Sequence, residues 1–161
     1  MKHHEPFVPL KPSSTPTDPV VIRGHTLLCL QGFRGEGYNR EFIDNMAAIH
    51  ARLQEEPNTR VLVIDTPDHF CAACPNLKAG CTLRGPNFEQ HIVVQDRQVL
   101  ELLGLKVGQE VTWAEVLYRI GSRMRGEMLD GICGDCQWLS LGYCKEGIDQ
   151  LHYSIDAKRQ G

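Results

Sequence analysis

The feature that most constrains this chain is a pair of short cysteine-rich segments. Residues 71–81 read CAACPNLKAGC and residues 133–144 read CGDCQWLSLGYC, so each is a Cys-x-x-Cys followed by a third cysteine. Two residues between a pair of thiols let the backbone curl until both sulfurs face one centre. Thiolates in this arrangement are typical ligands of zinc and of iron–sulfur clusters. The chain has seven cysteines in all: Cys29, Cys71, Cys74, Cys81, Cys133, Cys136 and Cys144.

Length, composition and charge exclude several classes of protein. With 161 residues, of which 42% are hydrophobic, the chain can bury a core, so its cysteines do not compensate for a missing one. An odd number of cysteines argues against a closed set of disulfides. Neither a membrane-spanning apolar run nor a secretory signal is evident, which predicts a cytoplasmic protein with reduced thiols. A net charge of −3 disfavours nucleic-acid binding, because that depends on neutralising phosphates with Lys and Arg.

The chain divides into two parts by composition. Five of the nine prolines lie in residues 1–19, interspersed with Ser and Thr, which predicts a flexible segment without a core. Residues 20–161 then form a single cysteine-rich, metal-binding domain.

Local patterns within that domain predict both strands and helices. VVIRG (20–24) and RVLVID (60–65) are β-branched and bounded by breakers, so we expect two strands that pair. Between them, residues 25–33 predict a buried helix of two turns. A longer helix follows, with Asn39 as its N-cap. Its buried face comprises Phe42, Met46, Ile49 and Leu53.

Two further helices are predicted in the second half of the chain. One runs over residues 89–103 and ends at Gly104, which suits a left-handed C-terminal cap. The other begins at Thr112, which forms a capping-box pattern with Glu115. Its apolar face comprises Trp113, Val116, Leu117, Ile120 and Met124. The predicted fold is therefore α+β: a small domain of four or five helices with a short two-stranded β element, pinned by the cysteine loops.

The residues next to the cysteines favour iron–sulfur over zinc. Cys74 is followed by Pro75, a pairing familiar at ferredoxin clusters, whereas zinc ribbons often have glycine after the second cysteine and this chain has Gln137. Zinc remains the alternative. A redox-active dithiol is a further one, although neither pair opens a helix after a strand and each has a third thiol nearby.

A resemblance to a known family supports the same chemistry. The stretches RGHTLLCLQGFRGEGYNREF, CAACP and CGDCQWLSLGYC, within residues 21–145, resemble a small family of uncharacterised bacterial and archaeal iron–sulfur binding proteins. The resemblance implies iron–sulfur binding and names no reaction.

Each three-thiol segment needs a fourth ligand. Two cubane clusters need eight ligands, and the seven cysteines with His25 would supply them. His25 lies four residues before Cys29, so both share one face if the segment is helical. A core histidine is the alternative for His25, and His69 and Asp135 are other candidate ligands. We expect Cys29 to complete one segment, with residues 71–81 favoured.

Together, these patterns predict an iron–sulfur protein of the cytoplasm. It would hold one or two clusters of the 4Fe–4S type and have a redox or cluster-assisted role. Its partner would be a redox or cluster-donor protein. Alternatives are a zinc-stabilised, non-enzymatic interaction module and a sulfur-handling enzyme with an open cluster site. The sequence contains no recognisable Ser-His-Asp triad or pair of catalytic carboxylates, so any catalytic residues are unknown. Cations near the cysteines could be Arg23, Arg34 and Arg84, for which a surface position is the ordinary case.

Overall fold

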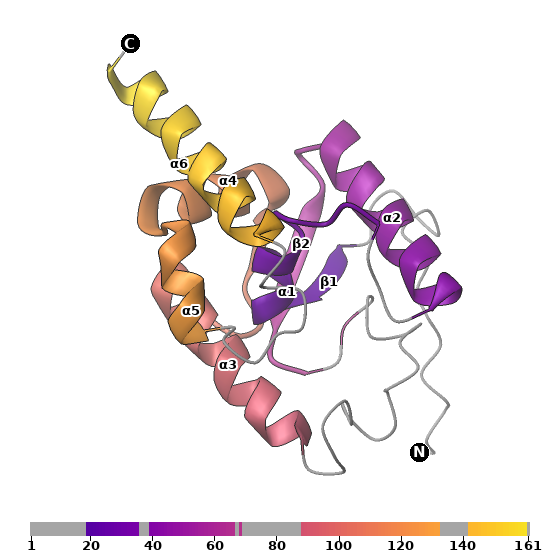
Figure 1. Cartoon of the computed structure of the whole chain (residues 1–161). Helices are drawn as coiled ribbons and strands as arrows, with labels where there is room; N and C mark the ends of the chain where they lie inside the picture. Colours follow the sequence, from indigo (N-terminus) through magenta and orange to yellow (C-terminus); the bar gives the residue numbers. More distant parts are fainter. Residues whose placement is uncertain (1–18, 36–38, 67, 69–87, 133–141, 161) are drawn as a thin grey trace, which may run out of the picture.

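The structure, a computed structural model, describes residues 19–35, 39–66, 68, 88–132 and 142–160. The described part contains six α-helices, three strands and one short 3-10 helix, η2 (Figure 1). Their bounds in chain order are β1 Val20–Arg23, α1 Gly24–Cys29, α2 Arg40–Glu55, β2 Arg60–Ile64, α3 Phe88–Leu103, β3 Glu110–Thr112, α4 Trp113–Arg123, η2 Gly126–Met128, α5 Leu129–Ile132 and α6 Tyr143–Gln160.

The strands form one sheet in the order β1-β2-β3. β1 and β2 pair in parallel, from Val20 opposite Val61 to Arg23 opposite Ile64, which confirms the predicted pairing. β3 adds an antiparallel third strand, so the expectation of two strands was wrong. β3 is only three residues long, which is too short to show the alternation of apolar and polar residues that marks a strand. A tight turn at Gly108 (φ 89°) brings it back beside β2.

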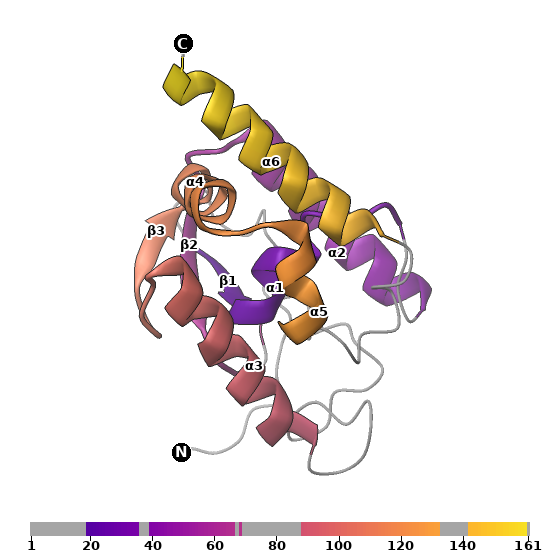
Figure 2. The same cartoon turned by 60° about the vertical axis from the view of Figure 1, so that its left-hand side comes forward.

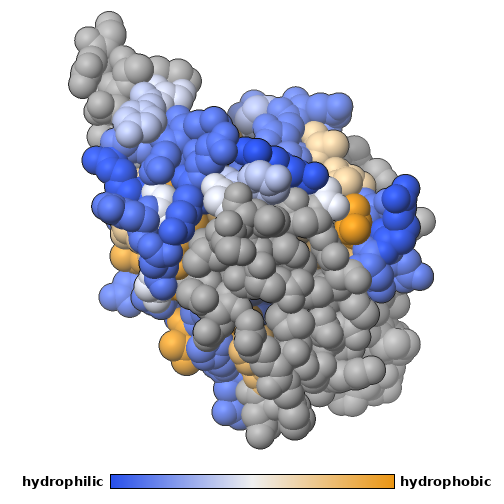
Figure 3. All heavy atoms as spheres, in the orientation of Figure 1, coloured by the Kyte–Doolittle hydropathy of each residue, from blue (hydrophilic) through white to orange (hydrophobic). Residues whose placement is uncertain are grey.

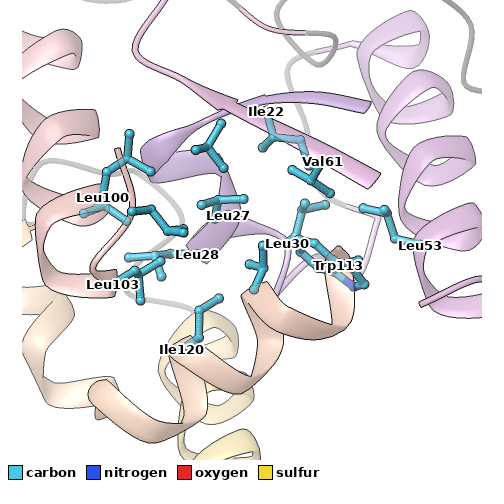
Figure 4. Close-up of a cluster of buried hydrophobic side chains, with 14 of the residues drawn as sticks. Ile22, Leu27, Leu28, Leu30, Leu53, Val61, Leu100, Leu103, Trp113 and Ile120 are labelled. Atoms are coloured by element: carbon cyan, nitrogen blue, oxygen red, sulfur yellow. The ribbon is translucent and has the colours of Figure 1, made fainter. Parts of the chain in front are cut away.

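The core lies between one face of the sheet and the surrounding helices. Side chains alternate along β2, with Val61 and Val63 fully buried and Leu62 and Ile64 only partly so. Figure 4 shows leucines of α1 beneath the strands, between leucines of α3 on one side and the indole of Trp113 on the other. The buried faces predicted for α2 and α4 are confirmed, and Leu117 of α4 packs against the core. The buried residues are Phe42, Met46, Ile49, Leu53, Trp113, Val116, Ile120 and Met124.

Helix ends follow the local sequence closely. The side chains of Asn39 and Thr112 accept hydrogen bonds from the backbone amides of Phe42 and Glu115, at 2.9 and 3.1 Å, so both predicted N-caps are confirmed. At the end of α3, Gly104 has φ 72°, and the amide of Leu105 donates to the carbonyl of Leu100 at 2.8 Å. That is the Schellman arrangement expected of a glycine cap.

Three elements differ from the sequence expectations. α1 is shorter than residues 25–33, because the chain turns after Leu30. α5 and α6 were not predicted. α6 crosses α4 and packs against it (Figure 2). Ile148 of α6 is fully buried.

Within the described ranges, no helix is both long enough and apolar enough to cross a membrane. Figure 3 shows a mainly hydrophilic described surface on the face that carries α6 and α2, with apolar side chains in small groups only.

Candidate functional site

The site is organised around α1, which begins where the two parallel strands end. β1 runs directly into α1, and β2 ends at the same edge of the sheet because Arg23 lies opposite Ile64. Asp68, four residues beyond β2, is fully buried and accepts a hydrogen bond from the backbone amide of Arg23 at 2.8 Å. The chain therefore reaches the start of α1 three residues before Cys71. The carboxyl ends of parallel strands are a common position for binding sites.

The start of α1 is capped by a residue of another helix. Asp96 of α3 is fully buried, and its Oδ1 accepts from the backbone amide of His25 at 2.9 Å. No side chain next to α1 caps it, so Asp96 takes the role that Ser or Asp normally has at the N-cap. This contact requires Gly24. A Cβ there would lie 2.8 Å from the Cα of Asp96 and still nearer its carbonyl.

Arg23 supplies the positive charge of this network. Its side chain is almost fully buried, with Nε donating to Asp96 at 2.7 Å and Nη2 to Glu89 at 2.6 Å. The ordinary expectation of a surface arginine was therefore wrong. Two carboxylates from α3 compensate the charge that Arg23 brings into the interior, because buried charges need paired, hydrogen-bonded partners.

His25 is oriented by the same carboxylate. Its Nδ1 lies 2.6 Å from Oδ1 of Asp96. Because a carboxylate only accepts, Nδ1 is the nitrogen that carries the hydrogen, and Nε2 of the neutral ring keeps its lone pair. A histidine whose inner nitrogen donates to a carboxylate is the usual arrangement around protein-bound metals. The ring is 23% exposed, so His25 lies at the edge of the core with its Nδ1 paired to Asp96.

Only one face of α1 lies outside the core. Gly24, Thr26, Leu27 and Leu28 are buried, and the two partly exposed members of the helix are His25 and Cys29. Helical spacing of four places their side chains on the same side. This confirms the predicted shared face.

The far end of α1 contacts the second cysteine segment. A Cβ on Gly32 would lie 2.7 Å from Sγ of Cys144, so the turn after α1 packs directly on the first turn of α6. Arg34 reinforces the contact, since its guanidinium lies 4.1 Å from the ring centre of Tyr143 and 3.1 Å from Glu146. Cys29 and Cys144 both pack at the edge of the core.

The residue that precedes that segment lies beside α3. The carbonyl of Ile132, the residue before Cys133, accepts from Nε2 of Gln95 at 2.7 Å. Gln95 is the neighbour of Asp96. The described residues on either side of the second segment thus lie against the α1–α3 pair.

Most of the predicted ligands lie outside the described residues. These are Cys71, Cys74, Cys81, Cys133 and Cys136, with the other candidate ligands His69 and Asp135. Arg84, the third of the cations considered, also lies outside them. Within the described ranges, no three His, Cys, Asp or Glu side chains are grouped closely enough to hold a metal ion. The pairing of Cys29 with residues 71–81 stays a prediction, while the described contacts bring its helix to Cys144.

Sequence reasoning missed the acidic residues of the site. Asp96 lies on the buried face of α3 with Ile92, Val99 and Leu103, at helical spacing. A single carboxylate within an apolar stripe is a signal that could have been noticed, because it needs a buried partner. Asp68 and Glu89 had no such signal.

Comparisons with known proteins give one match. A family described as "Protein of unknown function (DUF1284)" matches residues 37–142. The matched range begins after His25 and Cys29 and ends before Cys144. Neither a curated protein nor a solved structure matches the chain.

Proposed function

The chain belongs to the DUF1284 family, and we propose that it is a cytoplasmic iron–sulfur binding protein with a redox or cluster-assisted role. The observation that carries this proposal is that the described residues at the ends of both cysteine segments contact one helix pair, α1 and α3, or the residues next to α1. Asp68 precedes the first segment and Glu89 follows it, and both bind Arg23. Ile132 precedes the second segment and binds α3, and Cys144, its last residue, packs on the turn after α1.

The donor atoms of the described residues are chemically suited to an iron–sulfur centre. Cys29 and Cys144 supply soft sulfur, and His25 supplies a nitrogen oriented by a carboxylate. Thiolate and imidazole suit iron–sulfur clusters and zinc, whereas magnesium and calcium prefer oxygen. A cluster would provide an electron-transfer or substrate-binding iron. The protein's own contribution is to orient the donors, with Arg23 holding the carboxylate of Asp96 in place.

Anaerobic purification tests the proposal directly. We expect a brown protein with a broad visible absorption band, containing iron and acid-labile sulfide in similar amounts. Stoichiometric zinc in a colourless protein would instead support the zinc-stabilised interaction module. A protein that contains neither metal after anaerobic purification and reconstitution would contradict both.

The two cysteine segments are expected to bind metal independently, because each already contains three thiols. Cys74→Ser should lose about one centre's worth of metal and keep the other, and Cys136→Ser should do the converse. Elemental analysis and the visible spectrum measure both variants, and each serves as the control for the other. Unchanged metal content in both would show that the segments are not the ligand sets.

A further inference from the structure

α1 carries two candidate ligands, His25 and Cys29, which the sequence patterns do not assign to the same metal centre. α1 is a helix of only six residues, and its buried positions surround a single partly exposed face that carries a nitrogen donor and a sulfur donor four residues apart. Side chains at this spacing have Cβ atoms about 5–6 Å apart. Two metal ligands at i and i+4 on one helix face are a known way to bind a single ion.

The orientation of His25 makes it a ligand through one particular nitrogen. Oδ1 of Asp96 receives both the backbone amide and Nδ1 of His25, at 2.9 and 2.6 Å. Oδ2 of the same carboxylate receives Arg23 at 2.7 Å, so the carboxylate itself cannot rotate without losing a buried ion pair. Asp96 thus fixes the imidazole ring through Nδ1, and Nε2 is the nitrogen whose lone pair can bind a metal.

From this geometry we infer that α1 supplies two ligands to one metal centre, Nε2 of His25 and Sγ of Cys29, and that Asp96 is the positioning residue that fixes the imidazole. The inference rests on the proposed function, since it names donors for that centre. It goes beyond it in assigning His25 and Cys29 to the same centre, which leaves two of its four ligand positions for other thiolates, and in giving a structural purpose to the consecutive residues Arg23, Gly24 and His25.

The test measures nitrogen coordination directly. Full-length protein labelled with ¹⁵N-histidine is purified anaerobically, and pulsed EPR records nitrogen hyperfine coupling on the reduced cluster, or on Co²⁺-exchanged protein if the metal is zinc. Coupling is expected in the wild type and in His91→Ala, an exposed histidine of α3 that serves as the matched control. Coupling should vanish in His25→Ala.

A second measurement tests the shared centre and the role of Asp96. His25→Ala and Cys29→Ser should each release the same centre, so the double variant should lose no more metal than either single one. Asp96→Asn should weaken metal affinity by about 10–100-fold in a chelator competition while leaving far-UV circular dichroism unchanged. If Asp96→Asn fails to fold because Arg23 loses its partner, the other variants decide.

The outcomes separate this inference from the proposed function. Full metal content without nitrogen coupling in the wild type would overturn the imidazole ligand while leaving an all-thiolate centre. Additive metal loss in the double variant would place His25 and Cys29 on different centres and overturn the pairing. Absence of any metal in the wild type would overturn the proposed function and this inference together.

Discussion

At the scale of single residues, Asp96 joins three consecutive positions of the chain. It pairs with the guanidinium of Arg23, requires the bare backbone of Gly24 and binds both nitrogen donors of His25 that face it. Each contact depends on the others, since the approach of α3 that allows the salt bridge also excludes a side chain at position 24. The short sequence Arg-Gly-His is thus explained by one buried carboxylate.

Gly24→Ala is expected to destabilise the fold. Its Cβ would overlap backbone atoms of Asp96, which cannot move aside as a flexible side chain could, and overpacking of this kind costs about 1–3 kcal/mol. Urea unfolding measures the change. Gly131→Ala in α5 is the matched control, because no described atom lies within 4 Å of its Cβ position. Equal stability of the two variants would contradict the close approach.

His50 makes stability depend on pH. It lies on α2, its ring is 5.5 Å from that of Phe33, and it bonds to the backbone of Leu30. Burial lowers the pKa of His50 below its usual 6.5, and the hydrogen bond to Leu30 opposes that shift only in part. As pH falls through 6.5, the unfolded chain therefore takes up a proton that the folded protein resists.

The free energy of unfolding should therefore decrease as pH falls from about 7.5 towards the lowered pKa of His50, and it should level off below that pKa. His50→Gln removes the titration, so its stability should fall less over the same range. Urea unfolding of both proteins at each pH measures the difference, in which the other groups cancel. Parallel curves would show that His50 does not contribute.

At the scale of elements, α6 is placed by contacts between backbones. Cβ atoms on Gly32 and Gly126 would overlap its first turn, and one on Gly121 of α4 would lie 2.9 Å from the carbonyl oxygen of Leu151. Gly147 of α6 itself packs on the backbone of Gln31. These glycines let α6 approach both α1 and α4 more closely than larger residues would allow, and they place Cys144 beside the end of α1.

Gly147→Ala tests whether this approach positions the metal ligand. Its Cβ would lie 2.8 Å from the backbone carbon of Gln31, so α6 must shift, at a cost of about 1–3 kcal/mol. We expect lower stability and partial metal loss from the centre that uses Cys144. Gly131→Ala again serves as the control in metal analysis and urea unfolding. Full metal content in the destabilised variant would show that the close packing of α6 does not control metal binding.

At the scale of the whole molecule, the described part begins its first strand at Val20, and both the sheet and α1 follow from there. Residues 1–18 lie outside the described residues. Their proline-rich composition predicts that they add nothing to the core.

A chain that starts at Val20 should therefore keep the thermal midpoint and the metal content of the full-length protein. Differential scanning calorimetry and elemental analysis measure both. A loss of several degrees would show that the proline-rich segment docks on the domain.

Local sequence patterns were sufficient for much of the fold. Apolar spacing determined the buried faces of α2 and α4. Asn39 and Thr112 marked where these two helices begin, and Gly104 marked where α3 ends, because caps and amphipathic stripes act within a few residues. The spacing of His25 and Cys29 likewise determined that they share a face of α1.

The tertiary structure alone decided how these parts meet. β3 pairs only because a turn folds it back on β2, and α6 docks through glycines whose absent side chains leave no periodic signal. Asp96 lies 71 residues from His25 in the chain, and their contact follows from the packing of α3 on α1. The sequence alone determined which donor atoms are available. Packing decided the orientation of His25, because a carboxylate buried by one helix acts on the first turn of another.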